Sequence, residues 1–228
     1  MPNNWYQLSE TARNWRVLVH AAKKGAEDAG YTLSRVPGRG LSNVWNLAKS
    51  GKKQVASIRT TRDRFIAFPP LDGGKKWKTL DDVELVIVAA TDSKNDPKNI
   101  EVYIFPADEV RKRFDASYAA RIKDGHVVRD QFGMWLSLDP DNRATPSSVG
   151  SGIIEKYKSV GRYSIDAIIA EAKALTWSEG SGEVEPAPEA EEVQPTTIAQ
   201  VMQWARERVA EIAGVRVEAV KLDLKLEY

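Results

Sequence analysis

Six basic side chains lie within one stretch of the sequence, residues 44–70, and they are the residues best suited to chemistry. Lysine and arginine neutralise phosphate charge and donate hydrogen bonds to phosphate oxygens, so such a cluster is typical of a nucleic-acid-binding surface. The aromatic residues Trp45, Phe65 and Trp77 are interleaved with or follow them, and bases can stack on their rings. The six predicted phosphate contacts are Lys49, Lys52, Lys53, Arg59, Arg62 and Arg64.

The distribution of charge agrees with this prediction but does not require it. Residues 1–80 contain 15 Lys and Arg against 5 Asp and Glu, although the whole chain carries a net charge of only +1. A basic half of this size attracts a polyanion, with DNA or RNA as the obvious candidates. The alternative is structural, because Lys and Arg on edge strands prevent aggregation and the aromatic residues then belong to the core.

Other catalytic and binding patterns are absent. The chain has no cysteine, which excludes disulfides and thiolate metal sites and fits a reducing cytoplasm. A histidine-based metal site would need His20 and His126 to converge, since the chain has 2 histidines. A glycine-rich turn begins at Gly38, but Asn43 takes the place of its third glycine. No segment is long and apolar enough for a membrane span, and no secretory signal is visible, so we expect a cytoplasmic protein without membrane contact.

The elements that position these residues follow from hydrophobic spacing. Ser9 is a suitable N-cap for a first helix, and Gly30 ends it. A nearly continuous apolar run at 82–90 predicts a strand covered on both faces. The expected order is a helix at 9–29, strands at 44–48, 54–60, 64–68, 82–90 and 100–105, a helix from 106, short strands near Val127 and at 135–138, and a helix at 165–175. This order predicts an α/β (α+β) fold with a mixed central sheet flanked by helices.

The C-terminal part of the chain differs in composition. Residues 178–195 contain six glutamates, three prolines and no Lys or Arg, which predicts an extended acidic linker after a main domain at 1–177. Residues 196–228 then predict a helix and one strand, too small a unit to bury its own core. We therefore expect this tail to bind the main domain, a protein partner or a second copy of the chain.

Five short motifs carry a resemblance to a known family. They are Trp45-Asn46-Leu47, Gly51-Lys52, Val55-Ala56-Ser57-Ile58-Arg59-Thr60-Thr61, Asp82-Val83-Glu84-Leu85 and Phe105-Pro106-Ala107-Asp108-Glu109-Val110. In this order, and over roughly residues 9–115, they resemble the PD-(D/E)xK nuclease superfamily. The resemblance implies a restriction-endonuclease-like fold.

The resemblance also implies where a catalytic site would lie. Members of this superfamily hold Mg²⁺ with an aspartate and with a glutamate or glutamine on adjacent strands, and a lysine two residues later helps to activate water. The matching positions here are Asn46, Ser57 and Arg59. Asn and Ser supply no negative charge to a hard cation, and arginine does not readily give up its proton. We therefore expect these three positions to be vestigial, with no catalytic residue, no metal site and no cofactor.

Three functions remain open. The preferred one is a catalytically inactive, nuclease-like protein that binds nucleic acid through its basic hairpin. The second is a protein-interaction or assembly protein that uses the C-terminal tail. The third is an active Mg²⁺-dependent nuclease with relocated carboxylates, for which Asp63, Glu84 and Asp92 are the nearest candidates. Asp92-Ser93-Lys94 spells D-x-K, but it leads into a polar segment where such residues are normal in a turn.

Overall fold

A six-stranded mixed sheet forms the centre of the protein. The computed structural model describes residues 9–36, 44–131 and 133–174, and beyond these only 202, 205, 206, 209, 210, 217 and 220–222. The strand order is β1-β2-β3-β7-β8-β10; β3 and β7 are parallel and every other pair is antiparallel. The strands are β1 (Thr32–Arg35), β2 (Val44–Lys49), β3 (Lys52–Thr61), β7 (Leu85–Thr91), β8 (Asn99–Pro106) and β10 (Gly161–Ser164).

The β2–β3 hairpin lies next to the edge strand β1 and carries most of the predicted site. Its two-residue turn is Ser50-Gly51, with φ of 50° and 79°. Positive φ at both positions is the conformation of a type I′ turn, which suits the twist of a two-stranded hairpin. The turn fixes the register, which pairs Lys49 with Lys52 and Val44 with Ser57.

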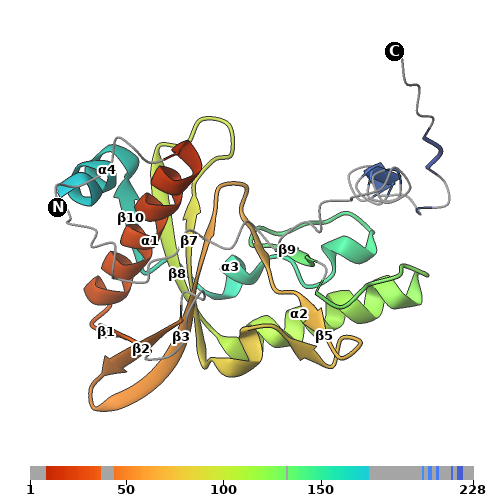
Figure 1. The fold of residues 1–228 in the computed structure, drawn as a ribbon, viewed down its shortest axis with the longest axis horizontal. Coiled ribbons are helices and arrows are strands. Elements are labelled where there is room, and N and C mark those ends of the chain that lie inside the picture. Colours follow the sequence, from red (N-terminus) through yellow and green to blue (C-terminus); the bar gives the residue numbers. More distant parts are fainter. Residues whose placement is uncertain are drawn as a thin grey trace.

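Two helices cover one face of the sheet, as Figure 1 shows for α1 and α4. They are α1 (Glu10–Asp28) and α4 (Ile165–Ala174). The amide of Ala167 meets the Ser164 hydroxyl at 3.5 Å, as expected for a helix N-cap. The first core lies between these helices and the sheet, and it includes Val19, Ala22 and Ile168.

The opposite face is covered by α2 (Ala107–Lys123) and by several short elements. Two small two-stranded sheets pair β4 with β9 and β5 with β6. The second core lies here and includes Phe68, Trp77, Phe105 and Phe114. The short elements are β4 (Phe65–Ala67), β5 (Pro70–Leu71), β6 (Lys76–Trp77), η2 (Leu80–Asp82), β9 (Trp135–Ser137), η3 (Pro146–Ser148) and α3 (Ile153–Lys156).

The mixed α/β class, the first helix, the hairpin and the two apolar strands are confirmed. The strand expected at 64–68 exists as β4, but it pairs with β9 outside the main sheet. The strand expected near Val127 is wrong, since this residue is 79% exposed and lies in no strand. The helix expected from 106 exists as α2, and its Ile122 is 46% exposed near the C-terminal end. Strands β1 and β10 were not predicted.

The predicted linker at 178–195 and most of the predicted tail at 196–228 lie outside the described residues. Within those residues, no helix combines the length and the apolar character that crossing a membrane requires.

Candidate nucleic-acid interface

The three positions predicted to be vestigial, Asn46, Ser57 and Arg59, share one face of the sheet. Side chains alternate along a strand, so Ser57 and Arg59 point away from the first core, to which their neighbours Ala56 and Ile58 belong. On β2, Asn46 lies between two residues that pack on the first core, so it also points to the second face. The structure therefore brings the positions that the family resemblance selected to one side of two paired strands.

Two of these positions, Asn46 and Ser57, are neutral, and the third, Arg59, is a cation. The Asn46 side chain donates a hydrogen bond to the Arg35 carbonyl oxygen at 3.3 Å. Ser57 is fully buried, and its hydroxyl finds no hydrogen-bond partner among the described residues. Arg59 Nη1 donates to the Ile58 carbonyl oxygen at 3.2 Å, and the guanidinium carbon lies 4.4 Å from the centre of the Phe68 ring.

Arg59 is a partly covered cation without a carboxylate partner in the described part of the chain. Burial lowers the pKa of its guanidinium from 12.5 to about 10, so it remains protonated at neutral pH. An aromatic ring face attracts a cation, which offsets part of the cost of burial. The position that the family resemblance assigns to a catalytic lysine thus holds a positive charge at neutral pH.

The magnesium site that the resemblance implies does not fit the residues present. Asn46 and Ser57 offer no carboxylate. The Glu84 carboxylate accepts from the amide of Val55, the strand partner of Asn46, but it is a single acidic group. Across the described residues, no group of three or more histidine, aspartate or glutamate side chains is arranged to hold a metal ion.

The three alternative carboxylates do not come together, because Glu84 lies beside this site and Asp63 and Asp92 lie at the other end of the sheet. Glu84 accepts a hydrogen bond from the Val55 amide at 3.0 Å, at the start of the β3–β7 pairing. Asp63 lies beyond the other end of β3, about 25 Å from Val55 along the strand. Its carboxylate accepts a hydrogen bond from the Thr61 hydroxyl at 2.9 Å. Asp92 accepts hydrogen bonds from Lys98 and Asn99 and pairs with Arg162 at 3.1 Å.

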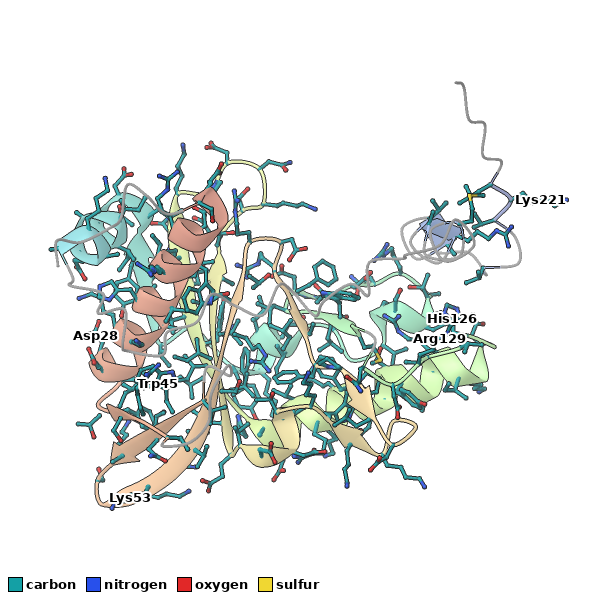
Figure 2. The ribbon with its side chains drawn as sticks, viewed as in Figure 1. Asp28, Trp45, Lys53, His126, Arg129 and Lys221 are labelled. Atoms are coloured by element: carbon teal, nitrogen blue, oxygen red, sulfur yellow. The ribbon has the colours of Figure 1, made fainter. Side chains whose placement is uncertain are left out.

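Five of the six predicted phosphate contacts form two separate groups, and the sixth, Arg59, lies within β3 between them. Lys49, Lys52 and Lys53 lie at the turn end of the β2–β3 hairpin, and Figure 2 shows Lys53 at its far end. Arg62 and Arg64 follow the opposite end of β3, about 30 Å away for a strand of this length. The structure therefore does not bring the six side chains together on one surface.

Arg64 is committed to internal contacts. Its guanidinium donates to Asp139, Glu101, the Thr91 carbonyl oxygen and the Tyr103 hydroxyl, which uses all five of its N–H groups. Burial alone would lower the pKa of Arg64, but the hydrogen bonds to Asp139 and Tyr103 and the nearby carboxylates raise it above its ordinary value. Arg64 is thus a structural cation.

The lysine group is extended by two cations that the sequence prediction missed. Lys23 Nζ lies 4.2 Å and the Arg35 guanidinium carbon 5.7 Å from the centre of the Trp45 ring. Lys49 lies over the ring of Tyr31 at 4.9 Å and donates to the Ala29 carbonyl oxygen at 2.7 Å. We call this surface the basic edge; it consists of Lys23, Arg35, Lys49, Lys52 and Lys53.

A sequence signal for the basic edge exists. No Asp or Glu occurs between Ala29 and Arg62, a stretch that covers β1, β2 and β3. Of the aromatic residues predicted to stack on bases, Trp77 is buried in the second core and Phe65 is 37% exposed on β4, away from this edge. Of these three aromatic residues, only Trp45 contacts the basic edge, and Lys23 and Arg35 lie over its ring.

Comparisons with known proteins found no relative of this chain. No protein-family model, no curated protein and no solved structure matches the chain.

Proposed function

We propose that this protein binds nucleic acid through the basic edge and does not cleave it with a metal ion. One observation carries the proposal: five cations gather on an edge whose three strands contain no carboxylate. Lys52 and Lys53 are exposed and make no ion pair with the described residues, so they are available to phosphates.

The arrangement of the elements supports a restriction-endonuclease-like fold as part of this proposal. A helix precedes a hairpin, and the second strand of that hairpin carries Ser57 and Arg59 beside the apolar strand β7. This is the order on which the family resemblance rests. The chain departs from that expectation at β4, which leaves the main sheet to pair with β9.

The chemistry of the vestigial positions supports binding rather than cleavage. Hydrolysis assisted by magnesium requires carboxylates that hold the ion and a group that activates water. Asn46, Ser57 and Arg59 supply neither, so these positions argue against metal-assisted cleavage, and the exposed lysines of the basic edge remain for phosphate contacts. The proposed role is therefore an accessory that holds DNA or RNA while another protein acts on it.

Binding to labelled duplex DNA and to single-stranded DNA and RNA, measured by fluorescence anisotropy at several salt concentrations, tests this proposal. The variant Lys52→Glu/Lys53→Glu should bind at least about tenfold more weakly, and its salt slope should fall by about 2 because two phosphate contacts are lost. Incubation with plasmid and Mg²⁺ or Mn²⁺ should yield no cleavage.

The matched control is Lys94→Glu/Lys112→Glu, which changes the net charge equally at two exposed lysines away from the basic edge. This control should retain most of the affinity. The absence of binding at low salt, or equal losses in the two double variants, would contradict the proposal.

A further inference from the structure

A polar pocket of about 580 Å³ lies at the end of the sheet opposite the hairpin turn. Its walls come from segments distant in sequence: the β3–β4 turn, the residue after β7, strand β8, the residues after β9, and the segment between α3 and β10. A pocket of this size is typical of sites for small molecules. Its charged lining residues are Arg64, Asp92, Glu101, Asp139, Lys158 and Arg162.

The inner part of the pocket is closed by internal bonds. Glu101 accepts from Arg64 Nη1 at 3.0 Å, from the Tyr103 hydroxyl at 2.7 Å and from Arg162 Nη1 at 3.2 Å. The carboxylate of Asp92 accepts from the Asn99 side chain, from two backbone amides and from Arg162 Nη2. These two carboxylates are therefore occupied by donors of the protein itself.

The outer part retains unused donors on one side. Arg162 spends two of its five N–H groups on Glu101 and Asp92, and its side chain is 56% exposed. Lys158 and Ser159 are exposed, and neither side chain has a partner among the residues that the structure describes. This side of the pocket can donate several hydrogen bonds and carries positive charge.

The other side retains unused acceptors. Asp139 receives one hydrogen bond on each oxygen, both from Arg64, and its side chain is 40% exposed. A carboxylate oxygen has capacity for a second hydrogen bond, so Asp139 can accept from a ligand. Ile154 and the ring of Tyr103 supply the apolar part of the lining.

Unused donors on Lys158 and Arg162 and unused acceptors on Asp139 line the same pocket, so the lining can pair with an anionic and a cationic group of one ligand. We propose that the pocket binds a small zwitterion of the amino-acid class, with its carboxylate at Lys158 and Arg162 and its ammonium group at Asp139. The site is separate from the basic edge and does not depend on nucleic-acid binding.

Amide chemical shifts of the ¹⁵N-labelled full chain, titrated with L-glutamine, L-leucine and L-phenylalanine, test the proposal. At least one of them should shift the amides of Ser159 and Arg162 to saturation. Acetate and n-butylamine, each carrying one of the two charges, should bind at least about tenfold more weakly, because each loses one charged hydrogen bond. Lys158→Ala and Asp139→Asn should each weaken binding of the amino acid to a similar degree.

Lys94→Ala, which removes an exposed lysine outside the pocket, serves as the control and should leave the affinity unchanged. Failure of all three amino acids to shift these amides would overturn the proposal. Acetate binding as tightly as the amino acid would overturn it as well, because the pocket would then be an anion site.

Discussion

Arg64 and Asp139 form a bidentate ion pair across 75 residues of sequence, with Nε–Oδ2 at 2.7 Å and Nη2–Oδ1 at 3.0 Å. The pair ties the turn after β3 to the end of β9, and Arg64 also reaches Glu101 on β8 at 3.0 Å. Arg64 adopts a positive φ of 66°, which is unfavourable for a residue with a side chain. These contacts therefore hold a strained turn in place.

Replacement of Arg64 by Met should destabilise the protein by about 2–3 kcal/mol, because Glu101 and Asp139 lose their shared cation. This is less than the roughly 3–5 kcal/mol for a fully buried pair, because the Asp139 side chain is 40% exposed. Urea unfolding followed by circular dichroism measures this loss. Nucleic-acid affinity of the folded variant should remain unchanged, because the Arg64 guanidinium is bonded to Glu101 and Asp139 and does not belong to the basic edge.

Arg62→Met is the matched control two residues earlier. Arg62 is exposed, so its loss should change the free energy of unfolding by no more than about 0.5 kcal/mol. Comparable losses in the two variants would show that the ion pair does not hold the turn.

Asp92 makes the free energy of unfolding depend on pH under acidic conditions. The side-chain hydrogen bond from Asn99, together with the amides of Asn99 and Lys98 and the charge of Arg162, lowers its pKa from 3.8 to about 2. Because the folded pKa lies below the unfolded one, the contribution is complete above about pH 5 and is lost as the pH falls through about 2.

The free energies of unfolding of the wild type and of Asp92→Asn should therefore differ by about 2 kcal/mol near neutral pH, and by about half of that near pH 3. Denaturant titrations at several pH values measure this difference. A difference that stays constant over this range would contradict the assignment of the low pKa to Asp92.

The sequence predicted those parts of the fold whose signal is local. The helix from Glu10 to Asp28 has a helical hydrophobic period and is followed by Gly30, and β7 is apolar up to its last residue, Thr91. Strand β1 is four residues long and mostly exposed, and it forms only because β2 offers an edge, so no local pattern marks it. Strand β4 was recognised as a strand, but its partner β9 lies about 70 residues later and local patterns cannot identify it.

The candidate site divides in the same way. Ser57 and Arg59 are two residues apart on β3 and therefore share a face, which the local period of a strand determines. The partners of Arg64 come from Glu101 and Asp139, which are 37 and 75 residues away, so its structural role was not visible. Lys23 lies on α1, far in sequence from Trp45, so its place at the basic edge was not visible either.

Ser57 and Thr61 offer a matched pair on β3. The Ser57 hydroxyl is buried without a partner among the described residues, so Ser57→Ala should stabilise the protein by about 1 kcal/mol. The Thr61 hydroxyl donates to Asp63 and accepts from the Phe65 amide at 3.1 Å, so Thr61→Val should destabilise it by about 1 kcal/mol. Thermal unfolding of both variants measures the contrast, and a loss of stability in Ser57→Ala would reveal a partner for that hydroxyl.

Gly25 lies in α1 where this helix packs against β8. Replacing a helical glycine by alanine usually stabilises a helix by about 1 kcal/mol. Here an added Cβ atom would lie 2.6 Å from Val102 Cγ1, closer than packed atoms approach. Since overpacking of a core costs about 1–3 kcal/mol, Gly25→Ala should destabilise the protein despite the gain in helix propensity.

Val102→Ala tests this explanation, because it removes two of the three atoms that the new methyl group would meet. Each single variant should lose stability, Val102→Ala through the cavity that it leaves. The double variant should lose less than the sum of the two, because the alanine at position 25 then fills space that the valine has vacated. Urea unfolding of the four proteins measures the coupling. Strict additivity would mean that the contact between α1 and β8 adjusts to the extra methyl group. The close approach of the helix to the sheet would then not depend on glycine at position 25.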